Sequence, residues 1–317
     1  MITFIVRRTA TSIPVLILVS LIVFFLMRLL PGDIIDQIVA ASRISPSEEA
    51  LEALRRRFGL DQPIYAQYFN WLGRLFTGDF GMSFRNFQPG VEIIVPRLLP
   101  TIQIGLIALV LSTVIAIPLG ALSAARPNSV WDRIGAVGTF IGASMPYFLV
   151  GGLLIYFVAL QGRLLPPSGF VSPFVDFEES MKRTIMPAIT LSLSLTAILI
   201  RQARASFSEV LDLPYIQTAY AKGLSESQVI VQHAMKNALL PIVTILGLQL
   251  GGLFSGAVVT ETVFSVPGIG RLLVDSILAR DYPIVQTLVL MIAVTVVLAT
   301  LLVDIVYGVL DPRASRA

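Results

Sequence analysis

Residues 215–241 read YIQTAYAKGLSESQVIVQHAMKNALLP, a polar stretch that separates two hydrophobic segments of the chain. Pro214, just before this stretch, suits the first turn of a helix, and Gly223 suits the left-handed residue that ends one. Ser225 followed by Gln228 is typical of the capping box that starts a second helix. The stretch therefore predicts a helix, a sharp corner and a second helix.

The composition of the chain is that of a membrane protein. Of its 317 residues 55% are hydrophobic and 14% are charged, whereas about 25% are charged in an average soluble domain. The absence of cysteine excludes disulfides, zinc–thiolate sites and cysteine catalysis, and the single histidine, His233, excludes a histidine-rich metal site. The small net charge of +3 comes without the interleaved aromatic residues of a nucleic-acid site, so it indicates membrane topology instead.

Six hydrophobic segments are long enough to cross a bilayer, which takes roughly 20 residues. They are predicted at residues 9–30, 101–123, 134–160, 186–203, 238–264 and 285–310. Pro146 is expected to bend the third span or to free one of its carbonyl groups. Small residues four apart favour close helix packing, at Gly138 and Gly142 in the third span and at Gly247 and Gly251 in the fifth. The predicted fold class is an all-α membrane protein with six transmembrane helices.

Residues 31–100 form the largest polar section and predict a small helical lobe outside the membrane. Ser45, Pro46 and Glu48 mark the start of one helix, which Gly59 stops. Pro63 starts another, whose apolar face carries Ile64, Tyr68, Leu72 and Leu75. Two interpretations of the lobe stay open: a cover over the spans, or a docking platform.

The orientation of the chain is predicted from its positive charges. The first span follows Arg7 and Arg8; a cleaved signal peptide is the alternative, but no A-x-A-like site follows the long apolar core, which favours an uncleaved anchor. Lysine and arginine are more numerous in the segments on the side of the N-terminus than in the two short loops opposite. The positive-inside rule therefore places both termini and residues 204–237 in the cytoplasm, and the lobe outside.

The sequence lacks an energy source of its own. No G-x-x-x-x-G-K-[ST] phosphate-binding loop occurs, and ionisable residues in the spans are few, Asp304 being the clearest, which argues against proton-coupled transport. The chain is then a channel or facilitator, a membrane scaffold, or the membrane part of a complex powered elsewhere. The ordered corner favours the third class, because its helix suits a groove on a soluble partner, with Ile216, Ala219 and Tyr220 as its apolar side. A helix that lies flat on the membrane is the alternative.

Two patterns in the corner are those of a known family. Y-x-x-T-A-x-A-K-G-L occurs at residues 215–224 and H-A-x-x-N-A-x-x-P at residues 233–241. Together they resemble the EAA loop of binding-protein-dependent ABC importer permeases in its dipeptide, oligopeptide and nickel branch, although Gln217 and Thr218 depart from the general Glu-Ala consensus. Three further segments are similar to B-type subunits of that branch: residues 58–84, residues 261–286 and Asp311-Pro312-Arg313.

The resemblance implies a subunit with the type I ABC importer permease fold, which carries a peptide or related small solute and is no enzyme. The implied partners are a second homologous permease, two cytoplasmic ATPase subunits that bind the ATP, and an extracytoplasmic solute-binding protein; no cofactor or metal is implied for this chain. A nickel or glutathione importer stays open as the alternative. The corner becomes a coupling helix, with the expected coupling residues Tyr215, Gln217, Thr218, Ala219, Tyr220, Lys222, Gly223 and Leu224.

A second segment of interest follows the fifth span, around the turn Pro267-Gly268-Ile269-Gly270. Its position and the resemblance place it on the outer face, where it either reaches into the binding protein to help expel the solute or caps the pore. The expected outer residues are Glu261, Phe264, Pro267, Gly268, Gly270, Arg280 and Asp281. The expected organisation is an N-terminal region with the first span at residues 1–30, the lobe at residues 31–100, and a permease core of five spans at residues 101–317 with its coupling loop at residues 204–240.

Overall fold

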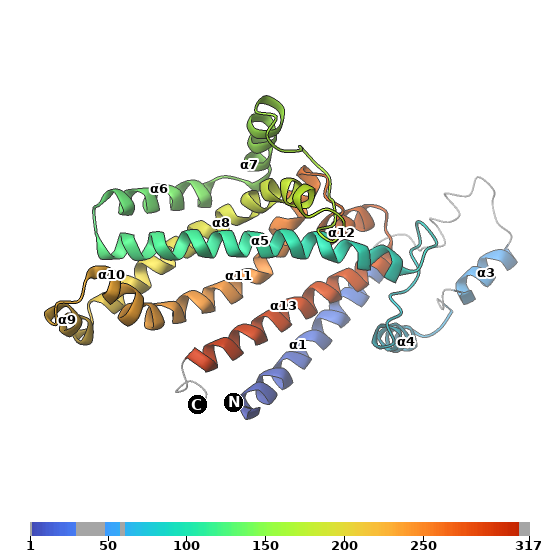
Figure 1. The fold of residues 1–317 in the computed structure, drawn as a ribbon. Coiled ribbons are helices and arrows are strands. Elements are labelled where there is room, and N and C mark those ends of the chain that lie inside the picture. The colour runs from blue at the N-terminus through green and yellow to red at the C-terminus, as the bar shows by residue number, and fades with distance from the viewer. Residues whose placement is uncertain (1, 30–47, 58–60, 311–317) are drawn as a thin grey trace. The chain divides into compact units, whose positions relative to one another are not determined.

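The computed structural model describes residues 2–29, 48–57 and 61–310 (Figure 1). Within these ranges the protein is helical, and its β-structure is limited to one isolated bridge between Met82 and Pro89. The predicted markers Ser45, Pro46 and Gly59 lie outside the described residues, as does the side chain of Asp304. Contacts divide the chain into a larger unit of residues 1–9, 99–271 and 296–317, and a smaller unit of residues 10–98 and 272–295.

Most of the larger unit is a series of long and short helices joined by turns, with a longer loop at residues 162–176. These elements are α5 (Gly90–Ala125), α6 (Val130–Ser144), α7 (Tyr147–Leu154), the π-helix η1 (Ile155–Gln161), α8 (Phe177–Leu211), α9 (Pro214–Ala221), α10 (Glu226–Gln228), the π-helix η2 (Val229–Ala234) and α11 (Met235–Val263). The helices that lie wholly or mainly in the smaller unit are α1 (Ile2–Leu29), α3 (Glu48–Arg57), α4 (Ile64–Phe76) and α12 (Ile269–Leu278). The last helix, α13 (Tyr282–Leu310), is divided between the two units at Val296.

The predicted membrane spans are present, with one of them broken. Five helices of the described chain are long and apolar enough to cross a membrane, and the bent pair α6 and α7 accounts for a sixth span. The two helices of this pair meet at 106°, because Met145 and Pro146 leave the helical conformation and α7 begins at the next residue, Tyr147. The predicted bend at Pro146 is confirmed, and it is sharp enough to separate two helices.

Glycines bring the long helices together at particular points. A Cβ atom on Gly142 would lie 2.6 Å from the carbonyl oxygen of Leu193, so α6 approaches the backbone of α8 there. On Gly247 it would lie 2.6 Å from Val303 of α13. At Gly138 and Gly251 the same atom would have ordinary contacts of 3.9 and 3.6 Å. In each predicted pair, therefore, one glycine is required by packing and the other is not.

The lobe helices occur where the sequence predicts them, with two differences. Pro63 precedes α4, and Gly78, with φ +80°, follows its end. Tyr68 on the predicted apolar face is buried, but Ile64 is 51% exposed and takes no part in the core. The helix of the second span already begins at Gly90, so the last part of the predicted lobe belongs to that helix.

Candidate functional site

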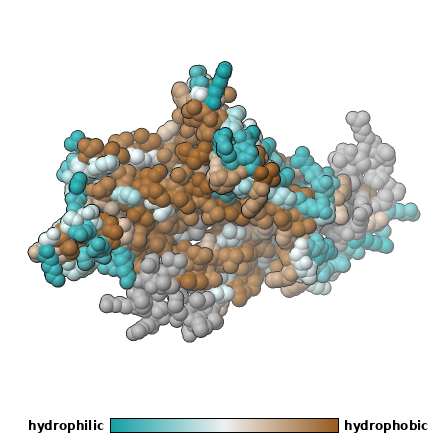
Figure 2. Space-filling model, in the orientation of Figure 1, coloured by the Kyte–Doolittle hydropathy of each residue, from teal (hydrophilic) through white to brown (hydrophobic). Residues whose placement is uncertain are grey.

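The α9 corner, residues 213–228, has the predicted local structure. Pro214 is the first residue of α9, and Gly223 adopts φ +83°, the left-handed conformation that only glycine enters without cost. Ser225 and Gln228 form the predicted capping box, in which Gln228 Oε1 accepts the Ser225 backbone N–H at 3.0 Å. In Figure 2 hydrophilic residues gather over α9 and α10, at one end of the long apolar helices α5, α8 and α11.

The underside of α9 is part of the protein's own core. Ile216 is fully buried and Ala219 is 5% exposed. Both belong to a cluster with Phe207 of α8 and with Val229 and Ile230 of η2. The prediction that Ile216 and Ala219 form an apolar side for a partner is therefore wrong: these two residues attach α9 to its own chain.

The opposite face of α9 is open to solvent. Tyr215 and Tyr220 are 41% and 43% exposed, and Gln217, Thr218 and Lys222 are exposed as well. Partial burial, and secondarily the charge of Glu226, raise the pKa of the Tyr220 phenol. The protonated hydroxyl of this side chain is able to donate a hydrogen bond. The exposed face thus offers two aromatic rings, two neutral polar side chains and one cation.

Polar contacts fix the corner to the neighbouring helices. Asn237 Nδ2 in α11 donates to the Tyr215 hydroxyl at 2.7 Å. The two helices beside the corner are themselves linked, because the Ser206 hydroxyl in α8 donates to the Ala238 carbonyl of α11 at 2.8 Å. Arg126, after α5, forms an ion pair with Glu226 at 3.1 Å. Asn237 and Ala238 have a signal in the sequence, since both belong to the H-A-x-x-N-A-x-x-P pattern; nothing in the sequence connects Arg126 with Glu226.

The helix that follows the corner leads without interruption into the fifth span. α10, η2 and α11 are consecutive from Glu226 to Val263, and Leu224 packs beside the cluster under α9. The sequence predicts the hydrophobic segment of this span from residue 238, so the observed helix begins about three turns earlier. Since α9 contacts both α8 and this continuous helix, a displacement of α9 has two rigid elements to move.

The other end of α11 is built around a buried carboxylate. Glu261 is fully buried, and the Thr101 hydroxyl of α5 donates to its Oε1 at 2.5 Å. The Arg271 backbone N–H in the first turn of α12 donates to Oε2 at 2.8 Å. The Ile269 N–H donates to the same Thr101 hydroxyl at 2.8 Å. Glu261 thus joins the end of α11 and the start of α12 to α5, and we name residues 261–271 the Glu261 turn.

The Glu261 turn has no room for side chains at two of its glycines. A Cβ atom on Gly268 would overlap the carboxylate of Glu261, and one on Gly270 would lie 2.8 Å from Val258 Cα. Phe264 is buried, and its carbonyl oxygen accepts the Gly169 N–H at 3.0 Å. Among the predicted outer residues of this turn, only Pro267 lies exposed.

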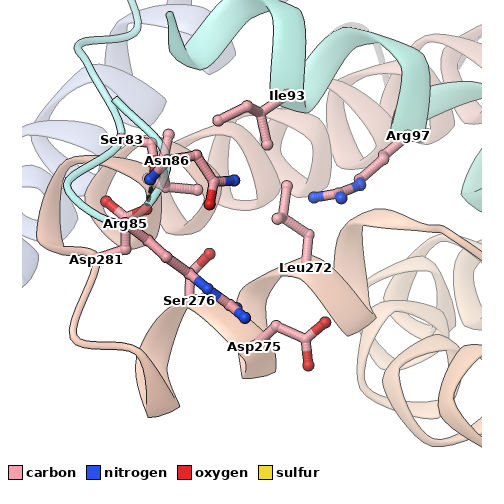
Figure 3. Close-up of a pocket in the computed structure, with 10 residues that line it drawn as sticks. Ser83, Arg85, Asn86, Ile93, Arg97, Leu272, Asp275, Ser276 and Asp281 are labelled. Carbon is pink, nitrogen blue, oxygen red and sulfur yellow. Dashed lines mark hydrogen bonds between the residues drawn. The ribbon is translucent and has the colours of Figure 1, made fainter. Parts of the chain in front are cut away.

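The predicted pair Arg280 and Asp281 belongs to the smaller unit, where the two residues differ. Arg280 is exposed with φ +53°, whereas Asp281 is 4% exposed and accepts hydrogen bonds from the Ser83 hydroxyl and, at 2.9 Å, from the Phe84 N–H. These contacts form one wall of a small pocket of about 60 Å³ (Figure 3). Arg85 extends across this pocket toward Asp275 of α12 in the same view. Asp281 is therefore occupied within the chain and is not presented at the surface.

An all-helical membrane core with an ordered, exposed corner is the architecture of a membrane subunit of a transporter. The chain belongs to the family of binding-protein-dependent transport system inner membrane components, whose model matches residues 116–316, and the N-terminal model of the same family matches residues 1–105. The resemblance to binding-protein-dependent ABC importer permeases, predicted from the sequence, is confirmed. The chain is a multi-pass inner-membrane permease subunit of an ABC importer, and ATP hydrolysis belongs to separate subunits.

Two relatives of known function align with nearly the whole chain, and a solved structure aligns with most of it. It is 38% identical over 336 residues to the dipeptide transport system permease protein DppB of Escherichia coli K12, covering 99% of this chain and 98% of the relative. It is 35% identical to the glutathione transport system permease protein GsiC of the same strain, covering 98% of each. A chain of the MetNI methionine ABC transporter, in an inward facing conformation, shares the fold with TM-score 0.56 and 16% identity over 70% of this chain and 97% of that one.

Proposed function

We propose that this subunit carries short peptides, and that it forms their path together with a second homologous permease. The support is the relatives that match it end to end, since a dipeptide system and a glutathione system both handle small peptide-like solutes. A nickel complex is the alternative cargo of the same branch. Two cytoplasmic ATPases would bind the ATP, and an extracytoplasmic binding protein would deliver the solute, with the α9 corner and both termini in the cytoplasm.

The single observation that carries the coupling role is the two-sided build of α9. Its underside is fixed by Ile216, which is fully buried, and the hydroxyl of the partly exposed Tyr215 ties the helix to Asn237 of α11. Its other face exposes Gln217, Thr218 and Lys222. A helix exposed on one side and rigidly attached on the other is suited to receive a force and pass it on.

From this arrangement we derive a mechanism for the proposed coupling. An ATPase that grips the exposed face of α9 moves it as the two ATPases close on ATP. Because Phe207 of α8 and Val229 of η2 pack against the underside of α9, α8 and α11 follow as rigid bodies. Tyr215 and Gly223 define the two ends of the gripped segment.

The experiment uses the complete importer in lipid nanodiscs, with ATP hydrolysis and uptake of a labelled dipeptide as readouts. Gln217→Arg with Lys222→Glu alters the exposed face without touching the core. We expect assembly to remain intact and solute-stimulated ATP hydrolysis to be lost. Glu209→Gln, at an exposed position of α8, serves as the matched control and is expected to leave hydrolysis unchanged.

Two results would overturn the proposal. Normal stimulated hydrolysis and uptake in the double variant would remove the coupling role from α9. Dipeptide flux through the purified chain alone, without ATP or partners, would show a self-sufficient channel or facilitator. If ATP-driven transport is present but dipeptides are not carried, competition with a nickel complex identifies the other cargo of the branch.

A further inference from the structure

Within the smaller unit, helix α4 packs across one end of helix α1. The Tyr68 hydroxyl of α4 is 2.8 Å from the Ser20 hydroxyl of α1, and the rings of Tyr68 and Phe24 lie 5.2 Å apart in an edge arrangement. Arg28 Nη2 donates to Gln67 Oε1 at 2.6 Å. Figure 1 shows α4 almost end-on while α1 extends across the view, so the two axes cross steeply.

The depth of this contact follows from α1. The membrane-spanning part of α1 runs from Thr9 to Arg28, and α4 touches it at Ser20, Phe24 and Arg28. Because Arg28 ends the span, α4 lies where the hydrocarbon gives way to water. A steep crossing at that level lays α4 roughly along the membrane surface.

Two contacts fix the rotation of α4 about its own axis. Gln67 faces Arg28, at the end of the span, whereas Tyr68 reaches Ser20, which lies about 12 Å deeper along α1 at 1.5 Å per residue. At about 100° per residue, the flank of α4 opposite Gln67 is the one that carries Tyr65, Phe69 and Phe76. This flank therefore faces toward the depth of Ser20, into the membrane.

The exposure of the side chains agrees with this rotation. Tyr65, Phe69 and Phe76 are 69%, 65% and 85% exposed in the isolated chain, which is unfavourable for three neighbouring aromatic rings in water. The flank that faces the end of the span exposes the polar residues Asn70 and Arg74 instead. Aromatic rings on one flank and polar groups on the other are typical of a helix at a membrane interface.

We propose that α4 is an interfacial membrane helix, with Tyr65, Phe69 and Phe76 inserted at the boundary of headgroups and acyl chains in the leaflet where α1 ends. It holds the first span at a fixed depth and ties the lobe to the bilayer. The partner of this surface is lipid and not the solute-binding protein, so this part of the lobe is no docking platform. The inference requires only that α1 spans the membrane, and it is independent of the solute and of the coupling role of α9.

The absence of cysteine from the chain makes a direct test straightforward. Single variants Tyr65→Cys, Phe69→Cys and Phe76→Cys are spin-labelled in the complete importer in nanodiscs of phosphatidylcholine and phosphatidylglycerol. Collision with oxygen, which concentrates in lipid, is compared with collision with a water-soluble nickel chelate. Asn70→Cys is the matched control on the polar flank, and Leu18→Cys, at a 57% exposed position of α1, is the lipid reference.

The proposal expects the ratio of oxygen to nickel accessibility to be several-fold higher at positions 65, 69 and 76 than at position 70, and close to the value at position 18. Equal nickel accessibility at all four α4 positions would overturn it, because the aromatic flank would then face water. Protection of the three positions from both reagents would overturn it as well and would indicate a protein partner. A loss of dipeptide uptake in the importer leaves this ratio unaffected, so the two proposals fail separately.

Discussion

The continuous helix from Glu226 to Val263 has a glycine-containing turn at each end, and the two turns require glycine for different reasons. The α9 corner turns the chain through Gly223, around which an added Cβ atom would meet no neighbour within 4 Å. The Glu261 turn uses Gly268 and Gly270, where an added Cβ would overlap side-chain or backbone atoms. One glycine is required by its backbone angle, and the others are required by lack of space.

This difference shows how each end works. The α9 corner keeps one face in solvent and buries only Ile216 and Ala219, so it is built to present a surface. The Glu261 turn buries a carboxylate among hydrogen-bond donors from α5 and α12, so it is built to hold the end of α11 and the start of α12 against α5. The comparison is tested by two kinds of substitution. One kind distinguishes the effect of the backbone angle on stability from the effect of limited space, and the other compares buried polar contacts with exposed ones.

The largest effect is expected from Gly268→Ala. The new methyl group overlaps the Glu261 carboxylate, so it displaces this group from its buried hydrogen bonds. Overpacking of this kind costs about 1–3 kcal/mol, and the hydrogen bonds lost to Glu261 add to that cost. Thermal unfolding of the purified importer measures the loss. Gly105→Ala in α5, where nothing lies within 4 Å, is the matched control, and equal stability of the two variants would contradict the crowded turn.

A somewhat smaller effect is expected at the carboxylate itself. Glu261→Ala leaves the Thr101 hydroxyl and the Arg271 N–H without their acceptor, at about 1–3 kcal/mol for each unsatisfied buried donor. Glu261→Gln retains one acceptor oxygen and is expected to unfold at a higher temperature than the alanine variant. Adding Thr101→Val to Glu261→Ala should cost less than the sum of the single changes, because the orphaned hydroxyl is removed. Strict additivity would show that the two groups act independently.

At the α9 corner, Gly223→Ala is expected to cost about 1–2 kcal/mol, the penalty of a left-handed conformation for a residue with a Cβ atom. Space is open there, so no crowding adds to it. Gly223→Asn tolerates the left-handed conformation better and should recover part of the loss. If alanine and asparagine destabilise equally, the backbone angle is not what requires glycine at this position.

The smallest effect is expected from the exposed ion pair between Arg126 and Glu226. The hydrogen bond to Glu226 raises the pKa of the Arg126 guanidinium, so the stability linked to this shift is present at neutral pH and is lost as the pH rises through that raised value. Because both side chains are partly exposed, salt screens the pair. Glu226→Gln should change the unfolding temperature slightly in low salt and not at all in high salt. A large effect that persists in high salt would assign the pair a structural role.

Local features of this protein were predictable because they depend on a few neighbouring residues. The start of α9 at Pro214, the stop at Gly223 and the capping box of Ser225 and Gln228 each arise from backbone geometry within one helical turn. The break at Pro146 has the same origin. The similarity of the corner to a family pattern then indicated the class of protein, which the family match confirms.

The orientation of side chains on these helices was less predictable. Ile216 and Ala219 were expected to face a partner, but they pack against Phe207 and Val229 of their own chain. In a membrane protein, lipid-facing and core-facing residues are both apolar, so hydrophobicity alone does not distinguish the two faces of a helix. Only the position of the neighbouring helices decides which face is buried.

By itself the sequence determined the hydrophobic spans, the corner and the family, since the length and hydropathy of a segment and the residues of a turn depend only on consecutive positions. The tertiary structure alone decided the partners of the buried polar groups. Glu261 meets Thr101 across 160 residues, and Asp281 meets Ser83 across 198. Such contacts cannot be predicted from neighbouring residues. A buried carboxylate needs a hydrogen-bond donor of any kind, and only the fold decides which donor lies beside it.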